Sequence, residues 1–214
     1  MMNRPYTPID QALMHFDQAL CTLFGRPPTT GRDNPADTAT EDHLTASERQ
    51  QSARLMRVNH TGEVCAQALY QGQAATAQQD QVKQQLLQAA AEENDHLDWC
   101  ETRLRELNSH TSILNPLFYA GSFMIGALNG RIGDRWNLGF LAETEHQVVR
   151  HLDEHMQRLP KHDEKSQTIL KTMKADEDRH ATTALDAGGI PLPLPIRLLM
   201  RTAAKVMTRT TYWI

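Results

Sequence analysis

A chain of 214 residues is long enough for one domain with a proper core and short for two. Its formal net charge of −4 and pI near 6.2 exclude an overall electrostatic attraction to nucleic acid. Few aromatic residues, abundant Ala, Leu, Gln and Glu, and the lack of sustained period-two alternation argue against a sheet protein, so we expect an all-α fold.

The three cysteines do not indicate a disulfide framework or a thiolate zinc site. Cys21, Cys65 and Cys100 are odd in number and form no C-x-x-C pair. A reducing compartment suits them, and the N-terminus lacks a compact apolar segment with a small-residue cleavage site. We therefore expect the protein to stay on the cytoplasmic side.

The first 45 residues predict a short helix followed by a flexible linker. Residues 8–24 form an amphipathic pattern that Gly25 and the Pro27-Pro28 pair close. Residues 29–42 are rich in Thr, Asp, Asn, Gly and Pro, which is typical of a solvated linker. No role is assigned to residues 1–45.

Residues 46–214 are expected to form the main domain, built on long helices. Helical patterns run over about 47–78 and, after a polar turn at Gln79 and Asp80, to about 108. They recur at about 134–159 and 163–187, where Pro160 separates the two helices and Gly188 follows the second. This order predicts a four-helix bundle made of two antiparallel pairs.

Two further segments are expected to face a membrane. Residues 111–130 hold no charged residue, but Asn, Pro and Gly dilute them, so we expect a buried or membrane-grazing helix rather than a spanning one. Within residues 190–214, a row four residues apart contains Arg197, Arg201, Lys205 and Arg209. Such a basic amphipathic helix suits an anionic membrane surface, and the alternative is an ordinary helix packed on the bundle.

Three Glu-x-x-His pairs place a carboxylate and an imidazole one helical turn apart. They are Glu93/His96, Glu143/His146 and Glu177/His180. Two pairs complete a repeat, because Glu63 precedes Glu93 by 30 residues and Glu145 precedes Glu177 by 32. The chain runs about fifteen residues to a turn and about fifteen residues back, and each helical segment is about 22 Å long. This length brings the Glu-x-x-His pair of the second helix beside the glutamate of the first.

The faces of these helices separate the two repeated pairs from the third. Glu145 lies in a continuous apolar stripe, and the faces around Glu93 and Glu177 are also mainly apolar, whereas the face of the first glutamate is mixed. The Glu143/His146 pair lies on a more polar face roughly opposite Glu145. We therefore treat this third pair as unrelated to the site.

Four carboxylates buried in a bundle need compensating cations. Carboxylates and imidazoles with open coordination positions suit iron or manganese better than a closed structural zinc site. A Glu from each of two helices and Glu-x-x-His from each of two others is the ligand pattern of di-iron and di-manganese bundles. We predict that two iron ions are bound there for oxidation by dioxygen, with ligands Glu63, Glu93, His96, Glu145, Glu177 and His180. Surface acids and satisfied core histidines are the alternative.

The residues next to the ligands suggest outer partners. Ligating histidines usually donate their second N–H to a carboxylate. Since Asp176 and Glu92 each precede a ligand glutamate, we expect Asp176 to support His96 and Glu92 to support His180, with solvated acids as the alternative.

Four runs resemble one known family, the demethoxyubiquinone hydroxylases of ubiquinone biosynthesis. They are VNHTGEVCAQALY (58–70), EENDH (92–96), FLAETEHQVVRHLDEH (140–155) and DEDRH (176–180). The resemblance covers about residues 50–214 with the ligand motifs in order, and generic ferritin-like proteins lack the H-x-G-E run.

The resemblance implies a ferritin-like di-iron monooxygenase that uses dioxygen to hydroxylate the ring of a polyprenyl demethoxyquinol. The family's ligand positions fall on the same six residues, and a further family histidine corresponds to His151, near the site rather than bound to metal. A quinol in the bilayer implies a peripheral membrane protein on the cytoplasmic side. Other ubiquinone-biosynthesis proteins and a second copy of the chain are candidate partners, and nucleic acid is not.

Two rival functions share the same fold. A ferritin-like ferroxidase would only oxidise and hold iron, but the uncharged segment and basic tail fit a closed storage shell poorly. A peroxide-scavenging or RNA-modifying di-iron enzyme is the second rival. The missing C-x-x-C pairs argue against an attached rubredoxin-type centre, and the acidic net charge argues weakly against RNA.

Overall fold

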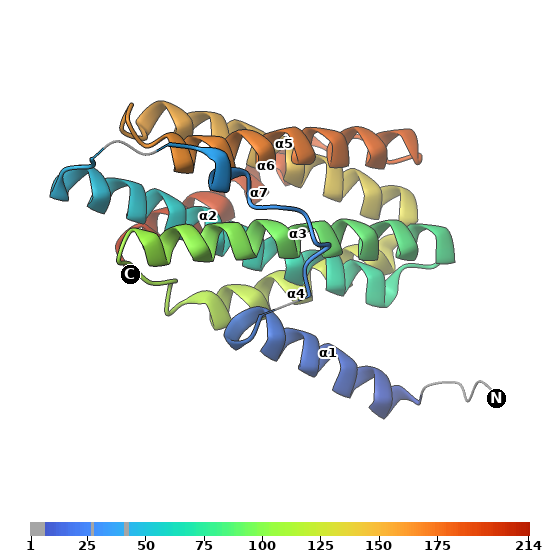
Figure 1. Cartoon of the computed structure of the whole chain (residues 1–214). Helices are drawn as coiled ribbons and strands as arrows, with labels where there is room; N and C mark the ends of the chain where they lie inside the picture. Colours follow the sequence, from blue (N-terminus) through green and yellow to red (C-terminus); the bar gives the residue numbers. More distant parts are fainter. Residues whose placement is uncertain (1–6, 27, 41–42) are drawn as a thin grey trace.

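The regular elements in the described part of the chain, residues 7–26, 28–40 and 43–214, are all helical in this computed structural model (Figure 1). In chain order they are α1 (Pro8–Phe24), the 3₁₀-helix η1 (Pro35–Thr38), α2 (Ala46–Thr76), α3 (Asp80–Glu106), α4 (Asn115–Ile132), α5 (Asp134–Arg158), α6 (Glu164–Asp186) and α7 (Leu194–Thr211). The expected all-α class is confirmed.

Local capping explains why the long helices begin near the predicted positions. Thr45 and Glu48 form a capping box at the start of α2, in which each side chain accepts a hydrogen bond from the other residue's backbone N–H. Asp163 caps α6 by accepting the N–H of Ser166. The carboxylate of Asp134 accepts the backbone N–H groups of residues 78 and 79 and so holds the turn between α2 and α3.

Helices α2, α3, α5 and α6 form a four-helix bundle whose core has two apolar clusters. One cluster includes Leu55, Met56, Leu104, Leu152, Leu170 and Met173. The other includes Tyr70, Leu86, Leu138, Leu141 and Ala184. On every one of the four helices, the predicted ligand positions fall between the residues of one cluster and those of the other. The bundle therefore surrounds a polar layer with apolar side chains at both ends.

Helix α4 packs closely on α2 through glycines. A Cβ at Gly72 would collide with the backbone of Phe123, and a Cβ at Gly126 would collide with the backbone of Leu69. The opposite side of α4 exposes large apolar side chains, Leu117, Met124 and Leu128 among them. Within the described ranges, none of the helices has both the length and the apolar character to span a membrane.

Helix α7 lies against α2 and α5 and uses part of the predicted basic row for packing. The guanidinium of Arg197 donates to the carboxylate of Glu143 on α5 at 2.8 Å. At its C-terminal end, Arg54 of α2 lies over the ring of Trp213, 4.3 Å from the ring centroid. Arg201 and Lys205 remain exposed. The interpretation of α7 as a helix packed on the bundle thus holds for one of its faces.

The segment before α2 touches the bundle although its composition predicts a solvated linker. Most of its described side chains are exposed, but Ala36 is buried and Thr30 donates two hydrogen bonds to Asp95 on α3. Composition reports an average preference for water and carries no information about such individual contacts. Helix α1 lies beside α4, outside the four-helix bundle (Figure 1), and exposes Ile9, Leu13 and Phe16.

Candidate metal centre

The six predicted ligands come from all four bundle helices and are all buried. None of the six residues has more than 6 % of its surface exposed. Glu63 lies on α2, the Glu93/His96 pair on α3, Glu145 on α5 and the Glu177/His180 pair on α6.

Five of these residues are in contact around two histidine nitrogens. Nδ1 of His96 lies 3.1 Å from Glu177 Oε1, 3.2 Å from Glu93 Oε2 and 3.5 Å from Glu63 Oε2. Nδ1 of His180 lies 3.1 Å from Glu177 Oε2 and 3.4 Å from Glu93 Oε1. Glu93 and Glu177 therefore bridge the two imidazoles, and both imidazoles present Nδ1 to the interior.

The carboxylate of Glu145 has a different partner. It accepts a hydrogen bond from the hydroxyl of Tyr70, which lies on α2 two helical turns beyond Glu63. Ligand atoms of Glu63, Glu93, His96 and Glu177 lie within 4.8 Å of one another, whereas Glu145 lies outside that group. Sequence reasoning did not assign Tyr70 to the site, and the seven-residue spacing from Glu63 was the available signal.

Burial and mutual repulsion favour protonation of two of the carboxyl groups. Burial raises the pKa of Glu63 well above its usual value, and the neighbouring Glu93 raises it further. Burial likewise raises the pKa of Glu145, with added repulsion from Glu177 and Glu93. For Glu93 burial acts in the same direction, but hydrogen bonds with His180 and His96 outweigh it and lower its pKa.

The same contacts favour protonated histidines. Burial lowers the pKa of His96, but its contacts with Asp176 and Glu177 outweigh this effect and raise the pKa well above its usual value. For His180, contacts with Glu177 and Glu93 outweigh burial and raise the pKa to about 11. A metal cation bound at Nδ1 would replace these protons, so metal binding at this layer is coupled to proton release.

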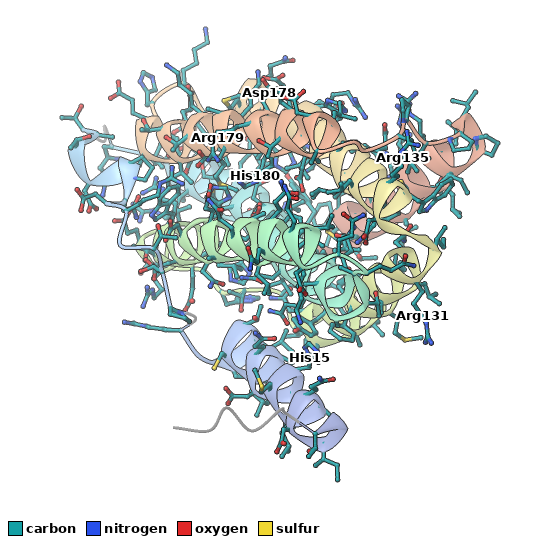
Figure 2. The ribbon with its side chains drawn as sticks, turned by 90° about the vertical axis from the view of Figure 1, so that its right-hand side faces the viewer. His15, Arg131, Arg135, Asp178, Arg179 and His180 are labelled. Carbon is teal, nitrogen blue, oxygen red and sulfur yellow. The ribbon has the colours of Figure 1, made fainter. Side chains whose placement is uncertain are left out.

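The outward nitrogens of the two histidines meet the acids expected from the sequence. Nε2 of His96 lies 3.1 Å from Asp176 Oδ2, and Nε2 of His180 lies 3.1 Å from Glu92 Oε2. Arg179 joins the two acids, because its guanidinium lies 2.7 Å from Glu92 and 2.8 Å from Asp176. Figure 2 shows Arg179 and His180 on α6, on the side near α3. These contacts orient each imidazole with Nδ1 inward.

The chemistry of this layer fits metal ions. Oε1 of Glu93 and Oε1 of Glu177 are buried, and each faces a histidine Nδ1, at 3.4 and 3.1 Å, without a well-aligned hydrogen bond to the described residues. A buried carboxylate oxygen needs a compensating positive charge, which here is either a protonated imidazole or a metal cation in its place. Together with two inward-facing imidazole nitrogens, these oxygens form a ligand set suited to iron or manganese.

The third Glu-x-x-His pair is not part of the layer, but Glu143 is more buried than its polar face suggested. Its carboxylate pairs with Arg197 at 2.8 Å and accepts a hydrogen bond from Gln147. Helix α7 covers this face of α5, which the periodicity of α5 alone cannot indicate. Glu143 therefore serves to dock α7.

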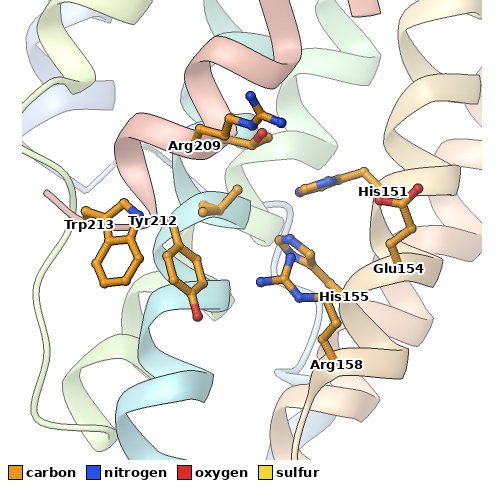
Figure 3. Close-up of a pocket in the computed structure, with 9 residues that line it drawn as sticks. His151, Glu154, His155, Arg158, Arg209, Tyr212 and Trp213 are labelled. Atoms are coloured by element: carbon orange, nitrogen blue, oxygen red, sulfur yellow. The ribbon is translucent and has the colours of Figure 1, made fainter.

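His151 lies in a separate cavity of about 220 Å³ between α5 and the C-terminal end of α7. Its ring is 3.8 Å from that of His155, and its Nε2 is buried without a hydrogen-bond partner among the described residues. Figure 3 shows His151 projecting from α5 toward Arg209 and Tyr212. No hydrogen bond connects His151 with the six candidate ligands in the described structure.

A small hollow between α2 and α5, too tight for a water molecule in this structure, touches the layer at Glu145. It is lined by Ala66, Leu69, Tyr70, Gln73, Leu141, Thr144 and Glu145. Apart from the Tyr70–Glu145 pair at its inner end, the lining consists mostly of apolar and uncharged side chains. A ligand could approach Glu145 by this route only if the lining side chains moved apart.

Comparison with known proteins agrees with this geometry. Residues 50–211 match the model of the family described as ubiquinone biosynthesis protein COQ7. The chain is 54 % identical over 214 residues, all of both chains, to a 3-demethoxyubiquinol 3-hydroxylase of Nitrosococcus oceani. A protein of the same name from Pseudomonas putida is 53 % identical over 209 residues, which cover 98 % of this chain and 97 % of that protein.

Proposed function

This chain belongs to the COQ7 family of ubiquinone biosynthesis proteins and acts as a 3-demethoxyubiquinol 3-hydroxylase, and we propose that its buried carboxylate–histidine layer performs the reaction with two bound iron ions. The proposed ligands are Glu63, Glu93, His96, Glu145, Glu177 and His180. Dioxygen is the proposed co-substrate.

The observation that supports the proposal best is the buried cluster in which Oε1 of Glu93 and Oε1 of Glu177 face two inward-directed imidazole nitrogens without well-aligned hydrogen bonds. The ligand types accept iron or manganese, and both metals are redox-active. We propose iron because the family resemblance implies a di-iron monooxygenase. When bound, the ions supply the electrons that activate dioxygen. The chain contributes a layer closed by apolar side chains at both ends, which limits access of water.

We further propose that the quinol ring reaches the layer through the hollow between α2 and α5, whose lining side chains must move apart to admit it. The hollow ends at Glu145, whose carboxylate Tyr70 holds by a hydrogen bond. Leu69 and Leu141 line the approach and suit an aromatic ring. The amide of Gln73 and the hydroxyl of Thr144 already donate to α5, so their oxygens are left to accept from the ring hydroxyls. In this arrangement Tyr70 fixes the orientation of Glu145 at the point where the ring arrives.

A polyprenyl substrate partitions into a bilayer, so we propose that the protein binds peripherally to the cytoplasmic side of the cell membrane. Large exposed apolar side chains on three helices support this: Leu13 and Phe16 on α1, Leu117 and Leu128 on α4, and Leu199 on α7. The exposed cations Arg201 and Lys205 would add attraction to anionic lipids.

Single-turnover chemistry tests the proposal. The iron-loaded, reduced protein is mixed anaerobically with demethoxyubiquinol, exposed to oxygen, and the extracted quinones are analysed by mass spectrometry. We expect a product with one additional oxygen atom, and none from Glu177→Ala. Oxidised iron together with unchanged quinol, in the presence of reductant, would contradict the proposal and favour a ferroxidase.

A further inference from the structure

Residues 28–40, here called the strap, precede the part of the chain that matches the family model. Figure 1 shows this segment crossing the outer side of α3 toward α6. We propose that Arg32 of the strap is a positioning residue, which fixes the imidazole of His96 in the metal centre by holding Asp176. This inference rests on the proposed metal-binding function of the layer.

The three side chains meet at one oxygen atom. Nη2 of Arg32 lies 2.7 Å from Oδ2 of Asp176, and the same oxygen lies 3.1 Å from Nε2 of His96. The second oxygen, Oδ1, accepts from Arg179 at 2.8 Å. With both of its oxygens held by guanidinium groups, the Asp176 carboxylate cannot rotate without breaking a charge-assisted hydrogen bond. The direction of its hydrogen bond with His96 is therefore fixed.

The strap holds Arg32 in place by contacts with α3. Thr30 donates through its backbone N–H and its hydroxyl to Asp95, at 2.7 and 2.5 Å. The guanidinium of Arg32 also lies over the ring of Trp99, 5.0 Å from the centroid, and that ring lies 5.4 Å from the ring of His96. Trp99 thus packs against Arg32 and keeps its guanidinium in place, while the path from Arg32 to His96 runs through Asp176.

The two histidines differ in the number of cations that hold the acid at their outward nitrogen. Glu92, which contacts the outward nitrogen of His180, is held by Arg179 at 2.7 Å, and the structure records no second cation on it among the described residues. Asp176 has two cations, of which Arg32 comes from outside the bundle. Loss of Arg32 should consequently affect the His96 half more than the His180 half.

Titration with Co(II) against a chromophoric chelator measures this effect without turnover. Replacement of an outer partner of a ligating histidine typically weakens metal binding roughly 10- to 100-fold, so Arg32→Ala, one bond further out, should weaken one of two Co(II) equivalents by about 5-fold. The visible absorption of bound Co(II) should change in that variant. Arg32→Lys, which keeps a cation near Asp176, should restore part of the affinity.

A double-mutant cycle separates positioning from a general effect of the strap. In an Asp176→Asn background, Arg32→Ala should change Co(II) affinity by less than about 1.5-fold, because the atom that couples Arg32 to His96 has lost its charge. Arg26→Ala is the matched control, since Arg26 is exposed and makes no hydrogen bond or ion pair with the described residues. It should bind Co(II) as the wild type does.

The outcomes distinguish this inference from the function on which it rests. If the wild type binds Co(II) and Arg32→Ala binds it equally well, the positioning role is overturned and the metal centre stands. If Arg32→Ala weakens Co(II) binding by the same factor in the wild type and in the Asp176→Asn background, the two changes are additive, and this also overturns the positioning role. A wild-type protein that binds no Co(II) overturns the metal centre, and the role of Arg32 with it.

Discussion

Replacing Glu145 with glutamine separates metal binding from folding at the proposed centre. Burial raises the pKa of Glu145 well above its usual value, which favours the neutral acid in the metal-free protein. Glutamine has the shape of that neutral acid, and its amide oxygen can still accept from Tyr70. We therefore expect the free energy of unfolding of the metal-free variant to lie within about 1 kcal/mol of the wild-type value.

The metal-bound protein should respond differently, because an amide is a poor substitute for a carboxylate ligand. Replacing a residue that supports a ligand weakens metal binding by up to roughly 100-fold. Loss of a direct ligand should weaken metal binding by at least that factor. At a fixed metal concentration well above the Kd of the variant, a loss of roughly 100-fold removes about 2.7 kcal/mol of metal-linked stability. For a chain of this size, the metal-induced rise in Tm should shrink by about 5–10 °C.

Glu143→Gln is the matched control on the same helix. Glu143 pairs with Arg197, whose side chain is 42 % exposed, so solvent screening limits the pair to about 1 kcal/mol. This variant should melt about 2–4 °C lower without metal and keep the full metal-induced rise in Tm. Thermal melts with and without Fe(II) or Co(II), together with metal analysis after dialysis, give both quantities. Equal loss of metal in the two variants would refute the assignment of Glu145 to the centre.

Three further predictions concern other parts of the structure. Burial lowers the pKa of His60 to about 4. As pH falls below about 6.5, His60 therefore takes up a proton in the unfolded chain but not in the folded protein. Wild-type stability in urea should therefore fall about 2 kcal/mol further between about pH 7.5 and pH 5 than that of His60→Gln, and equal pH slopes would contradict this. Tyr70→Phe should lower the free energy of unfolding of the metal-free protein by about 1–2 kcal/mol, and an unchanged urea midpoint would speak against the hydrogen bond to Glu145. The double variant Phe16→Ser, Leu117→Ser should bind anionic vesicles at least about tenfold more weakly in a sedimentation assay, whereas Gln11→Ser should bind as the wild type does. Equal binding by both variants and the wild type would show that the α1–α4 surface does not contact the membrane.

The helices could be predicted because their signals are local. Thr45 and Glu48 mark the start of α2 within a few residues, and apolar periodicity carries the long helices to ends close to those observed. The spacing of Glu63 from Glu93 and of Glu145 from Glu177 also follows from helix length, since an antiparallel pair returns by as many residues as it advances. The structure accordingly brings five of the six proposed ligands into contact.

What lies on the outer face of each helix could not be predicted in the same way. Periodicity showed Glu143 on the side opposite Glu145, but only the docking of α7 determines that Arg197 covers it. Composition indicated a solvated linker at residues 29–42, yet Arg32 meets Asp176 across 144 positions of sequence.

The sequence by itself determined the helices, their pairing and the ligand types, because these depend on intervals of one turn or one helix length. The tertiary structure alone decided that Glu145 contacts Tyr70, that His151 lies in a separate cavity, and that Arg32 contacts Asp176. The physical reason is that each of these contacts depends on how separate segments pack in space, and no repeat along the chain encodes that distance.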